Sequence, residues 1–213
     1  MKARLTLSET GAMLRKVAQG MIASQDLLTA ADRAVGDGDH GVGMGRGFEA
    51  VLAVLDNQEF SDLKDLFFKT GTALITSVGG ASGIIFGTWF SMGAMGLAGW
   101  QEFDGQALYL FLQDGLKAIQ GRGKAKAGDK TMVDALLPAC AALEGRAVDS
   151  LADALRLAVQ AAKGGAESTK EMTARIGKAR SLGPRALGHI DPGALSASLI
   201  LEFMLWYVES LPE

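Results

Sequence analysis

Cysteine is nearly absent from this sequence of 213 residues, which contains only Cys140. A single cysteine excludes an internal disulfide framework and is compatible with a reducing cytosol. Cys140 lies in the apolar run LLPACAAL at residues 136–143. This setting favours a buried, inert thiol over a nucleophile.

The sequence also lacks an excess of either charge. It has 21 basic and 24 acidic residues, with a formal net charge of -3. This balance gives no indication of a nucleic-acid surface or of a basic membrane patch. Lys2 and Arg4 are not followed by an apolar run, so we expect no signal peptide and a cytoplasmic location.

Residues 70–101 contain no charged side chain at all. This stretch is longer than the roughly 20 residues that cross a bilayer. Its middle, however, is interrupted by the segment SVGGASG at residues 77–83, and further glycines dilute both halves. We therefore interpret it as two buried helices that meet at a glycine-rich turn, and expect no membrane partner.

Convincing alternation of apolar and polar residues, typical of strands, is missing as well. The run at residues 199–203 could form a strand by itself, but its neighbours favour a helix. We predict a single all-α domain over residues 1–213 with about eight helices. A capping box at residues 6–9 starts the first, which we expect to reach about Leu28. The others are expected at about 44–55, 63–76, 82–97, 107–119, 131–143, 151–162 and from Asp191 through Tyr207.

Three aspartates, Asp32, Asp37 and Asp39, lie within eight residues of one another. No cysteine or second histidine is close to them in the sequence, so the ligand set is hard oxygen. Unit charges about 4 Å apart repel by roughly 4 kcal/mol at an effective dielectric near 20, so converging carboxylates need a cation. Such a set suits Mg²⁺, which usually keeps waters or phosphates in its shell. A solvated acidic turn is the alternative interpretation.

Two familiar motifs do not fit this segment. GDGDHG at residues 36–41 matches the dinucleotide pattern formally, but no strand precedes it and carboxylates stand where a pyrophosphate would bind. An EF-hand counted from Asp37 would place Val42 at its sixth position and Phe48 at its twelfth. A metal site that joins carboxylates to phosphates remains.

Three further loops could bind anions. Small residues at 77–83 open a helix, where free backbone N–H groups and the helix dipole favour an anion, although a close-packing turn explains them equally well. Residues 121–131 carry four cations among glycines, for which exposure to solvent is the alternative. Residues 178–193 add more cations before the last helix. Together these loops provide what phosphoryl transfer needs, which is positioning and charge neutralisation.

At this point the sequence resembles a known family, the nucleotide-binding L subunits of dihydroxyacetone kinases. The likeness is carried, in order along the chain, by GDGDHG (36–41), SVGGASG (77–83), RGK (122–124), GDKTM (128–132) and GHIDPG (188–193). It implies an antiparallel eight-helix barrel with the nucleotide held by loops at one end. It further implies that Asp32, Asp37 and Asp39 bind two Mg²⁺ ions that bridge the phosphates of ADP or ATP.

The resemblance also assigns nucleotide contacts. It places His40 and Gly41 beside the metals, Gly80, Ala81 and Ser82 at the phosphates, Gly123 and Met132 along the adenosine, and Asp191, Pro192 and Gly193 at the closing edge of the site. Two further positions differ from the family pattern. Gly43 replaces an asparagine and Lys178 an arginine, so that Lys178 keeps the charge but not the bidentate fork, and Arg180 is an alternative.

The family's ketose is bound by a separate K subunit through a covalent link to a histidine. Both histidines here, His40 and His189, belong to the nucleotide loops, so we expect this chain to need that partner. Either a captive ADP is rephosphorylated by a phosphohistidine carrier of the phosphotransferase system, or ATP exchanges, with another triose or tetrose ketose as substrate. The rival to a kinase function is a non-catalytic module, such as a nucleotide-sensing partner of a transcription regulator. The nucleotide-binding part of a fatty-acid kinase is a further alternative, but it normally begins a much longer chain, so a length of 213 residues argues against it. The sequence does not decide the oligomeric state, and a homodimer is one possibility.

Overall fold

The structure, a computed structural model, describes residues 2–146 and 150–212, so residues 1, 147–149 and 213 of the expected domain lie outside it. The described chain is helical apart from one small sheet, which confirms the all-α class. Its α-helices are α1 (Leu7–Ala23), α2 (Gln25–Val35), α3 (His40–Asn57), α4 (Leu63–Ser77), α5 (Gly80–Gly93), α6 (Gly105–Gly123), α7 (Val133–Ala141), α8 (Leu151–Ser168) and α9 (Pro192–Ser210). The 3-10 helices are η1 (Met95–Leu97), η2 (Thr169–Glu171) and η3 (Lys178–Ala186), and the strands are β1 (Arg4–Thr6) and β2 (Glu102–Asp104).

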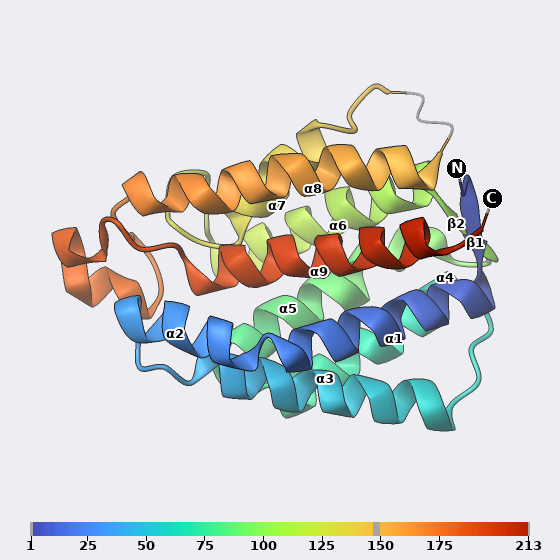
Figure 1. Ribbon diagram of the computed structural model, residues 1–213, viewed down its shortest axis with the longest axis horizontal. Helices are drawn as coiled ribbons and strands as arrows, with labels where there is room; N and C mark the ends of the chain where they lie inside the picture. The colour runs from blue at the N-terminus through green and yellow to red at the C-terminus, as the bar shows by residue number, and fades with distance from the viewer. Residues whose placement is uncertain (1, 147–149, 213) are drawn as a thin grey trace.

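Eight of the helices form a closed ring. Each packs against the next in the order α1, α3, α4, α5, α6, α7, α8, α9, and α9 returns to α1. Neighbours in the ring run in opposite directions along the long axis of the molecule (Figure 1). This arrangement is the antiparallel eight-helix barrel that the resemblance implies. α2 extends beyond α1 and packs against α3, α9 and η3.

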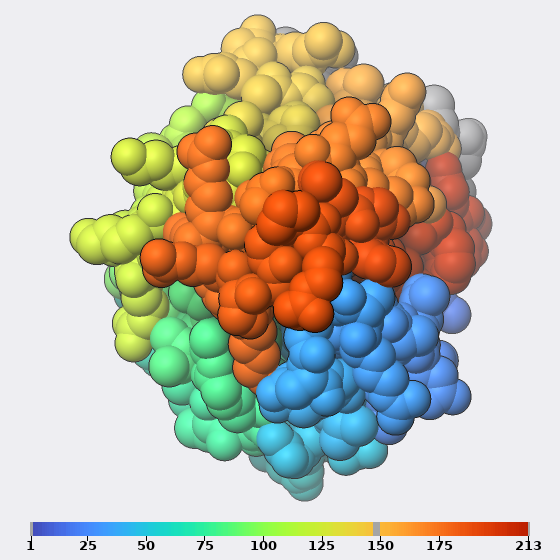
Figure 2. Space-filling view, turned by 90° about the vertical axis from the view of Figure 1, so that its left-hand side faces the viewer, coloured from blue at the N-terminus to red at the C-terminus, as the bar shows by residue number. Residues whose placement is uncertain are grey.

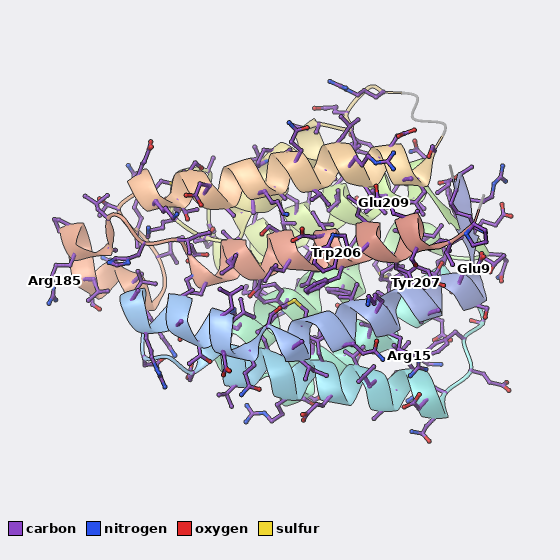
Figure 3. The ribbon with its side chains drawn as sticks, in the orientation of Figure 1. Glu9, Arg15, Arg185, Trp206, Tyr207 and Glu209 are labelled. Atoms are coloured by element: carbon purple, nitrogen blue, oxygen red, sulfur yellow. The ribbon has the colours of Figure 1, made fainter. Side chains whose placement is uncertain are left out.

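The two ends of the barrel differ. The connections α2–α3, α4–α5, α6–α7 and α8–α9 all lie at the end drawn on the left of Figure 1. Both termini and the sheet lie at the other end, where β1 pairs antiparallel with β2 and Leu5 faces Phe103. Figure 3 shows the same division, with Arg185 at the loop end and Glu9 and Tyr207 toward the termini. The glycine-rich segments of the sequence are therefore gathered at one end.

The charge-free stretch forms the α4–α5 hairpin of the ring. A Cβ added to Gly71 would lie 2.6 Å from the Gly87 carbonyl oxygen, so the two backbones touch where neither residue has a side chain. Behind this contact Phe67, Trp89 and Phe111 are fully buried, with the Phe67 and Phe111 ring centroids 4.7 Å apart. The two helices and the glycine turn between them are present as expected. They are buried on one side only, because Phe68 and Ile75 of α4 and Ile84 and Met92 of α5 are exposed. Among the described residues, no helix combines the length and the apolar character needed to cross a membrane.

Local signals set most helix ends correctly. The Thr6 hydroxyl accepts from the Glu9 N–H while the Glu9 carboxylate accepts from the Thr6 N–H, so the predicted capping box is present. Asp191 caps α9, with Pro192 as its first residue, and residues 199–203 are helical as expected.

Other boundaries were wrong. The helix expected to reach Leu28 ends at Ala23. Ser24 leaves helical geometry, with φ -88° and ψ 5°, and its hydroxyl donates to the Gly20 carbonyl. α2 then runs on to Val35, and α3 begins at His40 rather than near Met44. The sequence also missed the β1–β2 pair and η3, which are too short or too irregular to produce a periodic pattern.

Candidate functional site

The four connections at the loop end form one continuous surface. Figure 2 looks onto this end and shows η3 (orange) at its centre, with the α2–α3 region (blue) below it. The start of α5 (green) and the α6–α7 loop (yellow-green) lie to the left. Segments that are up to about 160 positions apart in the sequence, from Asp32 to Asp191, meet here.

The three aspartates converge as predicted. One carboxylate oxygen from each of Asp32, Asp37 and Asp39 lies within 4.8 Å of the others. Asp32 is buried on the last turn of α2 and accepts a hydrogen bond from the His40 N–H at 3.1 Å, whereas the other two are exposed. The turn between them depends on Gly38, whose φ of +79° is rarely adopted by other residues. All-oxygen donors at this spacing fit Mg²⁺, which the carboxylates could hold while leaving positions for phosphate.

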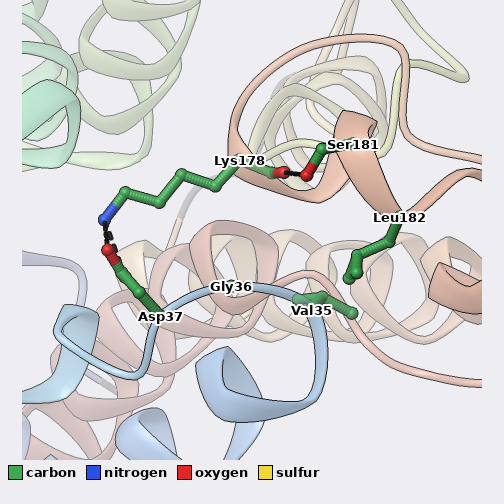
Figure 4. Close-up of a pocket in the computed structure, with 6 residues that line it drawn as sticks. All are labelled: Val35, Gly36, Asp37, Lys178, Ser181 and Leu182. Atoms are coloured by element: carbon green, nitrogen blue, oxygen red, sulfur yellow. Dashed lines mark hydrogen bonds and ion pairs between the residues drawn. The ribbon is translucent and has the colours of Figure 1, made fainter.

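Lys178 contacts the same cluster. Its Nζ lies 2.6 and 2.7 Å from the two carboxylate oxygens of Asp37 (Figure 4). It also lies 3.1 Å from both carboxylate oxygens of Asp39. The ammonium lowers the pKa of Asp37, and the two carboxylates raise the pKa of Lys178. Arg180, the alternative considered from the sequence, lies two residues further along η3 and is exposed.

A pocket of about 340 Å³ lies beside this ion pair. It is bounded by the end of α2 and the following turn on one side, and by η3 on the other (Figure 4). Asp37 and Lys178 form its polar edge, and Val35 and Leu182 contribute apolar surface.

His40 lies at the cluster, but its ring points away from it. The ring is buried, with Nδ1 3.2 Å from the Ser82 hydroxyl and Nε2 2.8 Å from the Ser196 hydroxyl. Burial lowers the pKa of this imidazole, so the neutral form is favoured. His40 therefore gives the acidic cluster its backbone N–H, while its side chain joins the start of α5 to α9. The sequence pattern did not point to Ser196, because that residue is 156 positions away on a buried helix face.

Packing explains two of the predicted glycines. A Cβ on Gly41 would lie 2.2 Å from the Gln25 carbonyl oxygen, which requires glycine where α3 crosses α2. A Cβ on Gly43 would lie 2.9 Å from the Val78 carbonyl oxygen. This contact gives a physical reason for glycine in place of the family's asparagine, whose side chain would meet the backbone of the α4–α5 loop.

The start of α5 has the features of an anion site. Gly79 and Gly80 have φ values of +83° and +58°, and no side chain caps the first turn. Arg46 donates to the carbonyls of Ser77 and Val78, which stabilises the end of α4 and fixes the loop. Ala81 is exposed and Ser82 half-buried, so the N–H groups of the first turn are available to a phosphate.

Met132 and Gly193 lie side by side at the loop end. A Cβ on Gly193 would be 3.7 Å from the Met132 Cβ, and one on Gly123 would be 3.3 Å from Ile85 of α5. One contact joins the α6–α7 loop to α9 and the other joins the end of α6 to α5, and both involve residues that the resemblance assigns to the nucleotide.

Asp191 has a strongly shifted pKa. Its carboxylate accepts from the Ala194 N–H at 2.7 Å, and its own N–H donates to the Thr169 hydroxyl. Desolvation by the surrounding protein raises its pKa to about 7, although some of the residue's surface remains exposed.

Lys130 does not face solvent, which was the alternative considered for the four cations of residues 121–131. It is 1% exposed, and its ammonium donates to the carbonyls of Thr169 and His189. Its backbone adopts a φ of +61°, an uncommon conformation for a residue with a side chain. Burial lowers its pKa, and Asp134 and Asp191 partly offset this effect. Lys130 therefore fastens the α6–α7 loop to the segment before α9, a long-range contact with no signal in the sequence.

The sequence profile described as the DAK2 domain matches residues 34–205. This range includes every residue assigned to the site except Asp32, which lies two positions before it. The chain belongs to the DAK2 domain family. It is 39% identical over 181 residues to the ADP-binding subunit DhaL of the PEP-dependent dihydroxyacetone kinase of Escherichia coli, covering 84% of this chain and 86% of that protein.

Longer kinases contain the same domain. An L-erythrulose kinase of Pectobacterium atrosepticum is 35% identical over 202 residues, and the match covers 87% of this chain and 33% of that protein. The crystal structure of the dihydroxyacetone kinase from C. freundii in complex with AMP-PNP and Mg²⁺ superposes with a TM-score of 0.71 at 28% identity. That match covers 92% of this chain and 33% of the kinase.

Proposed function

We propose that this chain is the magnesium- and nucleotide-binding subunit of a dihydroxyacetone kinase. The observation that carries the proposal is the convergence of Asp32, Asp37 and Asp39 at the barrel end that also presents the N-terminus of α5. The DhaL relative of this size is named an ADP-binding subunit, and the longer kinase of similar fold is a complex with a nucleotide analogue and Mg²⁺.

Each part of the site has a role in phosphoryl transfer. The three carboxylates would hold Mg²⁺, in two ions by resemblance to the family, and the metal would neutralise charge on the phosphates. The first turn of α5 binds phosphate oxygens through its N–H groups. Met132 and Gly193 line the adenosine side, and Lys178 adds a positive charge beside the phosphates. The chain thus positions and neutralises the nucleotide, which is most of what this reaction demands of a protein.

The acceptor is held elsewhere in this proposal. We assign the ketose to a separate K subunit, whose bound substrate offers a hydroxyl to the γ-phosphoryl group in line with the leaving ADP. Both histidines of this chain are in the nucleotide loops, and the ring of His40 is already bonded to two serines. The barrel end is the face that docks, because only there can the two substrates meet.

The nucleotide is a captive ADP in our proposal. The E. coli relative is PEP-dependent, so its phosphoryl group originates from phosphoenolpyruvate. We infer that a phosphohistidine carrier rephosphorylates ADP on this chain, in the cytoplasm, where a reduced Cys140 is expected. The whole chain acts as one nucleotide-binding domain.

The test is reconstitution. Purified protein is denatured and its released nucleotide measured, and then the protein is combined with a ketose-binding K subunit, dihydroxyacetone and the phosphocarrier proteins. We expect close to one ADP per chain and PEP-dependent formation of dihydroxyacetone phosphate. Protein that is free of nucleotide, binds none when it is added, and supports no transfer from any donor would refute the proposal.

A second candidate is an ATP-dependent kinase subunit for a tetrose ketose. It is favoured by the 35% identity to the L-erythrulose kinase. The same reconstitution separates the two, with ATP in place of the carriers and L-erythrulose beside dihydroxyacetone. If the protein binds nucleotide but no phosphoryl group is transferred to either ketose, the result would instead support the hypothesis of a non-catalytic nucleotide sensor.

A further inference from the structure

The ammonium of Lys178 contacts carboxylate oxygens that a metal ion would need as ligands. Its ammonium is within 3.1 Å of all four carboxylate oxygens of Asp37 and Asp39, which are two of the three residues assigned to the metal. A cation ligated by these aspartates must take oxygens that Lys178 now contacts. The lysine and the metal therefore compete, and both are positive, so each also repels the other.

The lysine is free to leave while its backbone stays in place. Ala179, Ala186 and Val35 are buried in a small apolar cluster of their own, and Leu182 packs on it, which anchors η3 to α2. The side chain of Lys178, in contrast, is 58% exposed on a flexible stem of four carbons. Gly177, with a φ of +74°, starts the segment without a side chain that could obstruct the movement.

We propose that Lys178 is an internal counter-ion that makes metal binding depend on nucleotide binding. This inference rests on the proposed function. A bare metal ion must displace the ammonium into water. A metal that arrives with a nucleotide brings phosphate oxygens, and the displaced ammonium pairs with them instead. The binding of metal and nucleotide is thereby coupled, and thermodynamic linkage requires the coupling to be the same in both directions.

Lysine suits this role better than the family's arginine. An ammonium is a compact charge that exchanges partners easily, whereas a guanidinium binds a carboxylate through a bidentate fork. In Lys178→Arg, metal and nucleotide binding should therefore remain coupled. The affinity for a metal ion without nucleotide should be lower than in wild type, because the guanidinium binds Asp37 and Asp39 more tightly.

The experiment compares wild type with Lys178→Gln, which keeps a similar length and removes the charge. Lys170→Gln is the matched control, because the side chain of Lys170 is 42% exposed and pairs with Glu167 rather than with the aspartates. Mn²⁺ binding is measured by calorimetry on nucleotide-free protein, first alone and then with saturating ADP. Circular dichroism checks that each variant is folded.

We expect Lys178→Gln to bind Mn²⁺ alone about three- to tenfold more tightly, which lies within the range expected for the loss of two exposed ion pairs. The factor by which ADP raises Mn²⁺ affinity should shrink, and Lys170→Gln should behave as wild type in both measurements. Unchanged or weaker Mn²⁺ binding by Lys178→Gln, an unchanged ADP factor, or an equal effect of Lys170→Gln would overturn the inference. Wild type that binds no ADP with Mn²⁺ would instead refute the proposed function itself.

Discussion

Asp191 illustrates how one residue can serve both folding and pH response. Its carboxylate caps α9, yet desolvation raises its pKa from 3.8 to about 7. Between these values the folded chain retains a proton that the unfolded chain releases. The contribution of Asp191 to stability is therefore fully present below pH 3.8 and is lost as the pH rises toward 7.

Asp191→Asn should remove this dependence, because an amide oxygen can still accept from the Ala194 N–H but does not titrate. We expect the free energy of unfolding of the wild type to fall relative to that of the variant between pH 4 and 7, with a slope of at most about 1.4 kcal/mol per pH unit. Urea unfolding at several pH values measures it. Parallel pH profiles for the two proteins would contradict the assignment.

A substitution at Asp37 tests, at the scale of a single residue, whether the aspartates bind a metal ion. Asp37 is exposed and its only cationic partner among the described contacts is Lys178, so Asp37→Asn should change the melting temperature of the free protein little. Stabilisation by ADP should lose its dependence on Mg²⁺, because one metal ligand becomes neutral. The readout is thermal unfolding with ADP in the presence of Mg²⁺ or EDTA. An Mg²⁺ effect as large as that of wild type would exclude Asp37 as a ligand.

At the scale of elements, glycine decides how closely α2 and α3 approach. Gly41→Ala forces a Cβ against the backbone of Gln25, and overpacking of this kind costs about 1–3 kcal/mol. Gly11→Ala is the matched control within a helix, because nothing lies within 4 Å of its added Cβ and alanine favours the helix by about 0.5–1 kcal/mol. Chemical denaturation should show opposite signs for the two variants. A neutral Gly41→Ala would mean that the helices separate easily there.

The helices also show which parts of the structure could be predicted from the sequence. Apolar periodicity and caps are local, so they gave the ring helices and the starts of α1 and α9. The break at Ser24 was missed, because Met21 and Leu28 continue the apolar spacing across it. The acidic cluster was predictable since its members are close in sequence. The burial of Lys130 and the contact of His40 with Ser196 depend on tertiary structure, which no local pattern encodes.

At the scale of the whole molecule, the closed ring separates two functions. Its helices bury the apolar surface, and four of its connections form the site at one end, with both termini at the other (Figure 1). A partner that binds the loop end therefore contacts the face opposite the β1–β2 sheet. Because Lys130 and His40 tie loops from different helices together, nucleotide binding should stabilise the whole barrel rather than one loop.

The most direct test of the central claim is the melting temperature of nucleotide-free protein with and without ADP and Mg²⁺. A ligand at 100 times its Kd adds about 2.7 kcal/mol, which corresponds to a rise of roughly 5–10 °C for a chain of this size. We predict such a rise with ADP and Mg²⁺ together, and a much smaller one with ADP in EDTA. No rise with ADP or ATP in the presence of Mg²⁺ would contradict the claim that this end of the barrel binds a nucleotide.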